Sequence, residues 1–151
     1  MPQQPQTGQL ETCIKLISEP SDQNLGQMLE SLLNRFSAER GCIWIEENRN
    51  VVFRGSEELM MSYPFSREVV LAAVKTRLGF MSFDAVEDDR LEPTESIMAT
   101  QIRSCLCAPA RDKDGHVLAV IYFDDKTSRG VFTEEDFEFV VTLMSNYPGA
   151  V

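Results

Sequence analysis

The sequence contains a single histidine, His116, and no pair of cysteines in the Cys-x-x-Cys spacing. Zinc sites need cysteine and histidine clusters at close spacing, so the four cysteines at 13, 42, 105 and 107 do not form a zinc pattern. Their scattered positions and apolar neighbours also differ from a disulfide framework. This cysteine usage indicates a reducing compartment and therefore a cytoplasmic protein.

Long apolar runs are missing as well. The longest, Val117–Phe123, has seven residues and is typical of a buried strand, whereas a membrane-spanning helix needs roughly 18. Residues 1–6 contain no basic side chain and no apolar stretch, so they do not form a signal peptide. We therefore expect a soluble protein without a membrane partner.

Positive charge is scarce. The chain has 14 lysine and arginine residues against 24 aspartate and glutamate residues, which gives a formal net charge of −10. Such an acidic surface repels phosphate backbones and excludes nucleic acid as a partner of this chain alone. The acidic excess is typical of a surface that promotes solubility.

The motifs of common enzymes are absent too. With one histidine, no phosphate-binding loop and no cluster of metal ligands, the sequence offers no recognisable catalytic set. The carboxylate pairs Asp88–Asp89 and Asp124–Asp125 are adjacent in sequence, and we expect them to be solvated. The sequence therefore predicts a non-catalytic domain with no metal site.

The chain does contain enough apolar material for one core. Its 151 residues are 43% apolar and 25% charged, as in ordinary globular domains. Residues 1–8 are rich in proline and glutamine, and we expect them to be disordered. We expect residues 9–148 to form a single domain.

Helical periodicity marks several segments. An apolar stripe that begins at Leu10 predicts a first helix, which ends before Pro20. The clearest stripe follows, in steps of three and one, at Leu25, Met28, Leu29, Leu32, Leu33 and Phe36. Similar spacing predicts two further helices over 66–79 and 133–146.

The segments between these helices have the period of strands. Short apolar runs predict strands at 42–45, 51–53, 80–83, 104–111 and 116–125. Polar turns at 46–50 and 112–115 join two pairs of them as hairpins. Strands that follow one another in hairpins indicate an antiparallel sheet of five to six strands with helices packed on it, the α+β class.

Five short motifs in this order resemble those of GAF domains. They are Ala38–Ile45, the run Phe83–Asp84–Ala85 with Asp88 and Arg90, the strand Ile102–Pro109, the strand Val120–Asp124, and Phe132 with Asp136. The resemblance spans roughly residues 10–147 and is similar to bacterial signalling GAF domains, although Ala119 stands where these usually have glycine. It implies a GAF/PAS-like fold.

The resemblance further implies that the N- and C-terminal helices share one face of the sheet, with a ligand-binding segment on the other. The residues that would line or approach this ligand are Phe83, Asp84, Ala85, Ile97, Thr100, Arg103 and Ser104. Phe83 and Ile97 would supply apolar walls. Asp84, Thr100 and Arg103 would supply polar contacts. The alternative is an acidic surface loop over an ordinary core.

A cyclic nucleotide is the first ligand that the resemblance suggests. Cyclic-nucleotide-binding GAF domains carry an Asn-Lys pair, then Phe, three residues, Asp and Glu. Lys126 and Asp136 match this pattern, whereas Asp125 and Phe137 replace the Asn and the Glu. We favour a local interpretation, because Thr133 and Asp136 have the spacing of a helix capping box.

Cys105 and Cys107 support another hypothesis, a thiol redox sensor. On a strand their Cα atoms would lie about 6.6 Å apart, near the limit for a disulfide. One GAF subfamily reduces free methionine sulfoxide with cysteines, but its Gly-x-Cys-Gly motif is absent here, as is the Cys-His pair of bilin-binding GAF domains. We favour buried apolar thiols.

The terminal helices carry apolar residues outside their main stripes, namely Leu16 in the first helix and Phe139 and Leu143 in the last. GAF domains commonly dimerise through these helices, so the resemblance predicts a homodimer. The leading hypothesis is a regulatory sensor domain in signal transduction, which binds a small-molecule effector and acts on an attached or associated signalling protein. A ligand-free interaction module is the alternative.

Overall fold

The computed structural model describes residues 5–55, 67–76, 78–90, 102–128 and 130–151. The elements follow in the order α1 (Pro5–Ser18), α2 (Asp22–Phe36), β1 (Arg40–Ile45), β2 (Asn50–Gly55), α4 (Arg67–Lys75), β3 (Phe80–Ser82), the 3₁₀ turn η1 (Ala85–Glu87), β4 (Ser104–Arg111), β5 (Val117–Asp125) and α6 (Glu134–Met144). In this part of the chain, no helix combines the length and the apolar character that crossing a membrane requires.

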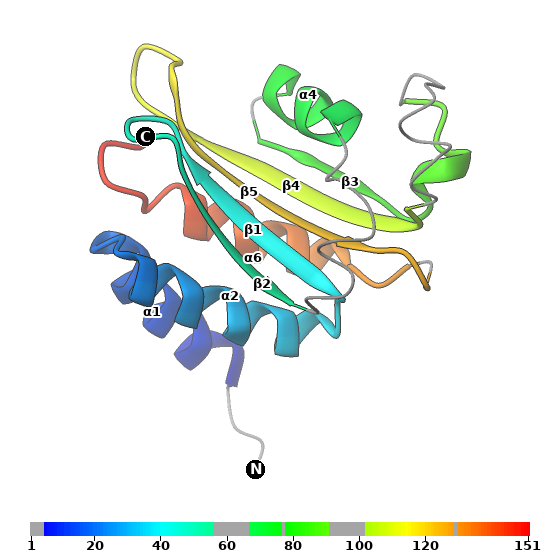
Figure 1. The fold of residues 1–151 in the computed structure, drawn as a ribbon, viewed down its shortest axis with the longest axis horizontal. Helices are drawn as coiled ribbons and strands as arrows, with labels where there is room; N and C mark the ends of the chain where they lie inside the picture. The colour runs from blue at the N-terminus through cyan, green and yellow to red at the C-terminus, as the bar shows by residue number, and fades with distance from the viewer. Residues whose placement is uncertain (1–4, 56–66, 77, 91–101, 129) are drawn as a thin grey trace.

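The five strands form one antiparallel sheet in the order β2-β1-β5-β4-β3 (Figure 1). Two hairpins, β1–β2 and β4–β5, meet where β1 pairs with β5, and Arg40 lies opposite Asp124 in that register. The sheet confirms the predicted α+β class and hairpin arrangement.

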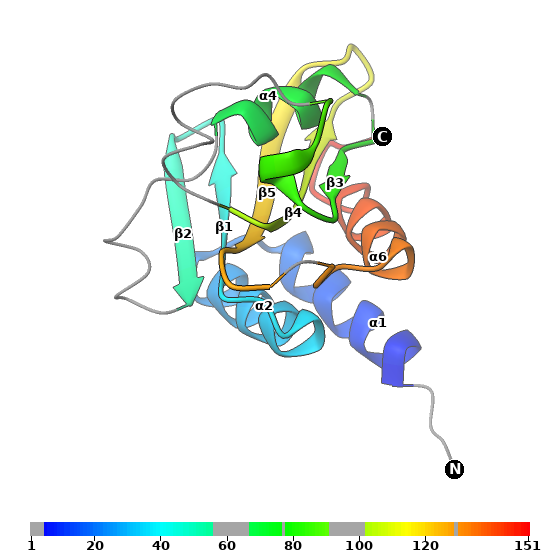
Figure 2. The same cartoon turned by 90° about the vertical axis from the view of Figure 1, so that its right-hand side faces the viewer.

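The two faces of the sheet are covered differently. Helices α1, α2 and α6 lie on one face and α4 on the other, as Figures 1 and 2 show. Because side chains alternate along a strand, Ile43 and Ile121 enter the core under α1, α2 and α6. Cys42 and Tyr122 point to the opposite face, under α4. The prediction that the terminal helices share one face is therefore confirmed.

Local sequence signals explain where the helices begin and end. Ser21 caps α2 by accepting a hydrogen bond from the Asn24 N–H, and Ser37 ends the helix in the left-handed conformation. Thr133 and Asp136 form the predicted capping box at the start of α6, each side chain accepting from the other's N–H. Such a cap satisfies N–H groups that have no partner within the helix.

Two expectations about the terminal helices need correction. Helix α1 begins at Pro5, so residues 5–8 of the segment expected to be disordered are helical; proline is well tolerated in a first helical turn. On α6, Phe139 and Leu143 are buried in the core, whereas Phe137 and Val141 are only partly buried. Because most positions of α6 are apolar, the spacing of its apolar residues does not identify the face that packs against the core.

Candidate functional site

The predicted ligand segment packs against the entry to β4. The Arg103 guanidinium donates from Nη1 to both carboxylate oxygens of Asp84, at 3.2 and 3.0 Å. The Ala85 N–H donates to the Arg103 carbonyl at 2.5 Å, and the Arg103 N–H donates to the Asp125 carbonyl at 3.0 Å. Three of the predicted site residues are thus brought together, and they anchor η1 to the end of the sheet.

Ser104 and Phe83 lie at the same end but do not face the space under α4. The buried Ser104 hydroxyl donates to the Ser128 carbonyl at 2.7 Å and accepts from the Val131 N–H at 3.1 Å. Strand β3 ends at Ser82, one residue earlier than predicted, and Phe83 is 69% exposed. Its ring lies beside Gly130, and its role as an apolar wall of a ligand site stays a prediction.

The two remaining predicted site residues, Ile97 and Thr100, lie outside the described residues. The described part of the predicted site is therefore the contact between residues 83–85 and residues 103–104.

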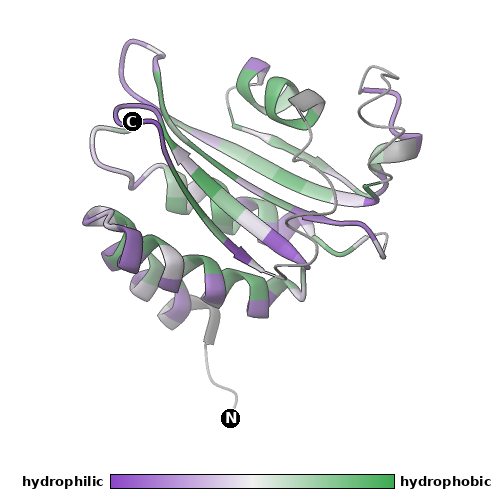
Figure 3. Cartoon of the chain, viewed as in Figure 1, coloured by the Kyte–Doolittle hydropathy of each residue, from purple (hydrophilic) through white to green (hydrophobic). Residues whose placement is uncertain are grey.

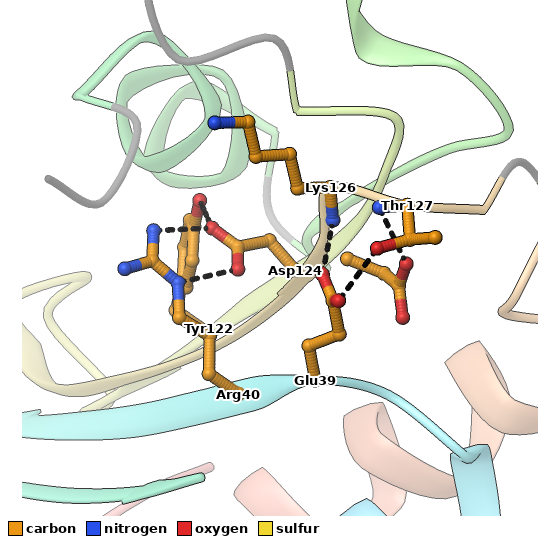
Figure 4. Close-up of polar contacts among 7 residues, drawn as sticks. Glu39, Arg40, Tyr122, Asp124, Lys126 and Thr127 are labelled. Carbon is orange, nitrogen blue, oxygen red and sulfur yellow. Dashed lines mark hydrogen bonds and ion pairs between the residues drawn. The ribbon is translucent and has the colours of Figure 1, made fainter. Parts of the chain in front are cut away.

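The α4 face holds a buried charged pair that sequence reasoning missed. Arg40 donates from Nε and Nη2 to the two carboxylate oxygens of Asp124, at 2.6 and 2.9 Å, and the Tyr122 hydroxyl donates to Asp124 at 2.5 Å (Figure 4). All three side chains are fully buried. Burial raises the pKa of Asp124, and the bonds from Arg40 and Tyr122 oppose that rise.

The expectation that Asp124 and Asp125 are solvated is wrong, because their exposed fractions are 0% and 3%. Strand β5 continues past its apolar run, and its pairing with β1 brings Asp124 opposite Arg40. Asp125 points to the other face, where its carboxylate accepts from the N–H groups of Thr127 and Ser128. The sequence signal that could have revealed this pair is a charged residue of opposite sign at the end of each of two apolar strands.

Glu39 ties the start of β1 to the loop after β5. Its carboxylate accepts from the Lys126 N–H at 2.7 Å and from the Thr127 hydroxyl at 2.7 Å (Figure 4). Figure 3 shows the strands hydrophobic along most of their length and hydrophilic at the end where β1 begins. At this end of the sheet, the charged side chains of Glu39, Arg40 and Asp124 therefore all form hydrogen bonds.

Three thiols share the α4 face with this network. In the strand register, Cys42 and Cys107 lie on either side of Tyr122, and Cys105 lies beside Asp124. Two strand spacings separate Cys42 from Cys107, about 10 Å between Cα atoms, which is too far for a disulfide. Burial raises the pKa of all three thiols. All of them are free, which supports the interpretation as buried apolar groups.

Asp88 and Arg90 hold the segment after β3 against the sheet edge. Arg90 donates to both carboxylate oxygens of Asp88 and, at 2.8 Å, to the Met81 carbonyl. The Ser82 hydroxyl donates to Asp88 at 2.5 Å. The bonds from Arg90 lower the pKa of Asp88 to about 2. Asp89 is exposed as predicted, but its neighbour Asp88 is not simply solvated.

Lys126 and Asp136 are the two residues that match the cyclic-nucleotide pattern, and Asp136 has a structural role. Besides its role in the α6 capping box, the Asp136 carboxylate lies 3.4 Å from Nε of Arg35 on α2. The favoured interpretation of this motif as a helix start is confirmed.

A hollow opens on the α4 face where β1 ends and β5 begins, four residues along these strands from Arg40 and Asp124. Its walls are apolar and come from β1, α4 and β5, with charged side chains at the rim; the lining includes Trp44, Val70, Val74, Val117, Val120 and Arg49. Trp44 contacts Tyr122 edge-on, with ring centroids 6.1 Å apart. An aromatic and aliphatic hollow with a few polar side chains in its lining is the usual form of a small-molecule site.

The β4–β5 turn brings Asp112, Asp114 and His116 together, with one potential ligand atom from each within 4.8 Å of the others. The Asp112 carboxylate accepts from the N–H groups of Asp114 and His116 and thereby closes the turn. Its position 3.4 Å from the His116 ring is an ion pair only when the ring is protonated. These contacts are those of a solvent-exposed turn.

The fold of this chain is similar to that of known proteins. No curated protein matches the chain in sequence. The free methionine-R-sulfoxide reductase from Neisseria meningitidis, in complex with its substrate, has a TM-score of 0.69 at 16% identity, covering 97% of this chain and 90% of that one. The GAF domain of the Acinetobacter phosphoenolpyruvate-protein phosphotransferase has a TM-score of 0.67 at 19% identity, with coverage of 98% and 93%. At such identities the likeness shows the fold alone.

A family model described as GAF domain matches residues 22–146. The match begins at the first residue of α2 and ends two residues after α6, so it includes the whole sheet and the charged network beneath α4. The chain belongs to the GAF domain family.

Proposed function

We propose that this GAF domain is a non-catalytic regulatory sensor, which binds a small molecule on the α4 face of its sheet. The observation that supports this most is the difference between the two faces. The face under α1, α2 and α6 is packed with apolar side chains, whereas the α4 face carries the Arg40–Asp124–Tyr122 network. Burying such a network is costly, and the same face also carries the apolar hollow lined by Trp44, Val70 and Val120, a form that suits a small molecule.

The non-catalytic part of the proposal rests on the thiols. Among the described residues, Cys42, Cys105 and Cys107 are the thiols of this face. Burial raises their pKa, and a thiol that stays protonated at neutral pH is a poor nucleophile. A sensor needs binding and a change of shape but no bond cleavage.

Charge pairing favours a ligand without phosphate. The guanidinium groups of Arg40, Arg90 and Arg103 each bind a carboxylate. At these three arginines a phosphate would have to compete with a carboxylate, and the hollow itself offers one arginine, Arg49, with the carboxylate of Glu46 in the same lining. We therefore place a neutral heteroaromatic compound ahead of a cyclic nucleotide, which remains the alternative that the family resemblance suggests.

Trp44 provides a direct readout, because it is the only tryptophan of the chain and it lines the hollow. Its emission should shift in a saturable way during titration with at least one of adenosine, guanosine, cyclic AMP, cyclic GMP and free methionine sulfoxide, and the same compound should raise the Tm. Val70→Asp should abolish the shift. Leu71→Asp, on the exposed side of the same helix, is the matched control.

The proposal fails if none of these compounds shifts the emission or the Tm and mass spectrometry of the purified protein finds no bound small molecule. That result would favour the ligand-free interaction module. A response to the cyclic nucleotides but not to the nucleosides would retain the sensor and overturn the preference for a ligand without phosphate.

A further inference from the structure

A small pocket opens at the C-terminal end of α6, beside the second half of β4. Its apolar lining comes from Pro109 and Ala110 of β4, from Val141 and Met144 of α6, and from the exposed Leu78. Its volume of about 220 Å³ lies below the range of about 300–1,000 Å³ that is typical of sites for drug-sized ligands. It shares no lining residue with the hollow under α4, so it is a separate cavity, and its size suits a small ligand.

The polar part of this lining has an excess of positive charge. Arg111 and Lys113 both contribute to it, and Ser145 adds a hydroxyl. Neither cation forms an ion pair within the described residues. Asp112 also lines the pocket, but its carboxylate already accepts from two backbone N–H groups of its own turn. Two cations against one carboxylate leave the side chains of the lining with a net charge of +1.

Arg111 is held in place without an anionic partner. Its guanidinium donates from Nη2 to the Val74 carbonyl at the end of α4 and, at 3.0 Å, from Nη1 to the Gly115 carbonyl. Its Nε is buried and has no hydrogen-bond partner among the described residues. Nε of Arg35 shares this property, but it lies 3.4 Å from the Asp136 carboxylate. Because buried polar groups are nearly always satisfied in native proteins, the Arg111 guanidinium is the group that calls for an acceptor from outside.

The strand geometry explains why Arg111 lies at this pocket. Strands β4 and β5 pair regularly as far as Ala110 and Ala119, and an irregularity then brings Arg111 opposite Val117. Such bulges redirect the neighbouring side chain and are frequent beside binding sites. Strand β3 pairs only with residues 105–107 of β4, so no strand among the described residues covers the edge of β4 beyond them. The guanidinium is therefore fixed at an open end of the sheet.

These features point to an anionic ligand with an apolar body. A single carboxylate matches a net charge of +1 better than a dianionic phosphate does, and its two oxygens suit guanidinium and ammonium donors. An aliphatic or aromatic body would cover the apolar surface of Val141 and Leu78. We propose that this pocket binds a small monocarboxylate with an apolar body, as a second ligand site of the domain. The site does not depend on a ligand in the hollow under α4.

Titration of the full chain with phenylacetate, followed by ligand-observed NMR, tests this proposal. Phenylacetate combines one carboxylate with an aromatic ring in about ten non-hydrogen atoms, for which we expect a Kd of about 1 mM. At about 10 mM it should raise the Tm by roughly 3 °C. Phenylacetamide, which has the same shape without the charge, should bind about tenfold more weakly. Phenyl phosphate should bind more weakly than phenylacetate as well.

Two variants place the binding in this pocket. Lys113→Gln should raise the Kd about threefold, since an exposed ion pair contributes little. Val141→Glu should remove measurable binding, because it places a like charge in the apolar lining. Lys15→Gln on α1 and Thr142→Glu beside the pocket are matched controls at exposed positions outside the lining, and they should leave the Kd unchanged.

Arg111→Gln tests the central residue and should raise the Kd by about tenfold or more, with circular dichroism as the check that the variant is folded. Should it fail to fold, the Lys113 and Val141 variants decide. Val70→Asp, which blocks the hollow under α4, should leave the Kd for phenylacetate unchanged and thus separates this site from the proposed sensor site.

The absence of binding at about 20 mM phenylacetate, well above the expected Kd, would overturn the proposal. So would a Kd that neither Lys113→Gln nor Val141→Glu changes, or binding that Val70→Asp removes. Tighter binding of phenyl phosphate than of phenylacetate would overturn the assignment of a monocarboxylate.

Discussion

Arg40 and Asp124 are directly opposite each other in the central strand pair, and two hydrogen bonds of 2.6 and 2.9 Å join their side chains without access to water. Removing one partner leaves an uncompensated charge in the interior. Arg40→Met should therefore lower the free energy of unfolding by about 3–5 kcal/mol, measured by urea denaturation with circular dichroism.

Replacing both partners separates the role of charge from that of packing. Arg40→Met combined with Asp124→Leu should cost clearly less than Arg40→Met alone, because no unpaired charge remains. The single variant Asp124→Leu completes the comparison. If the double variant loses as much stability as Arg40→Met and Asp124→Leu together, the two side chains contribute independently and their charge pairing does not explain the loss.

Asp88 makes the stability of the segment after β3 depend on pH. Its pKa of about 2 in the folded chain lies below the usual value of about 3.9 for an unfolded chain. The bound carboxylate therefore stabilises the fold fully above about pH 4, and this contribution is lost as the pH falls toward 2. Because Arg90 is largely exposed, we expect about 1 kcal/mol at neutral pH.

The comparison of wild type with Asp88→Asn between pH 3 and pH 7 measures this contribution. The difference in free energy of unfolding should shrink as the pH falls. Asp89→Asn, at the exposed neighbouring residue, is the matched control. A difference that is constant across this range would contradict the assignment.

The period of apolar residues and the turn signals were sufficient for α2, both hairpins and the start of α6, because each depends on neighbours within a few residues. The burial of Arg40 and Asp124 depends on a pairing across 84 positions, which no local pattern encodes. Likewise, the order of the motifs predicted that residues 83–85 lie near residue 103. The orientation of the Phe83 side chain, however, depends on the distant Gly130.

The contact between Phe83 and Gly130 gives a third prediction. Gly130 has a φ of +65°, and a β-carbon there would lie 2.4 Å from the Phe83 ring. Gly130→Ala should therefore cost about 2–3 kcal/mol, the sum of left-handed strain and a steric clash. In the background of Phe83→Ala the same change should cost only about 1 kcal/mol. Equal costs in both backgrounds would exclude the clash.

The four buried thiols should be protected from reagents in the folded protein. Dithionitrobenzoate should modify none of them rapidly at neutral pH, since burial hinders access and raises the pKa of the thiols on the α4 face. In guanidinium chloride all four should react. Ser145→Cys, at an exposed position, should react at once and verifies the reagent. Rapid native modification of Cys105 or Cys107 would revive the redox hypothesis.

The pairing of β1 with β5 also bears on how the chain reaches its fold. Each hairpin closes over a short stretch of chain, whereas joining them brings together segments about 80 residues apart, which is slow because of the entropy of closing so large a loop. A slip of one residue at this seam would turn Arg40 and Asp124 to opposite sides of the sheet. The buried pair therefore selects the native register, since only one alignment of the two hairpins leaves neither charge buried without its partner.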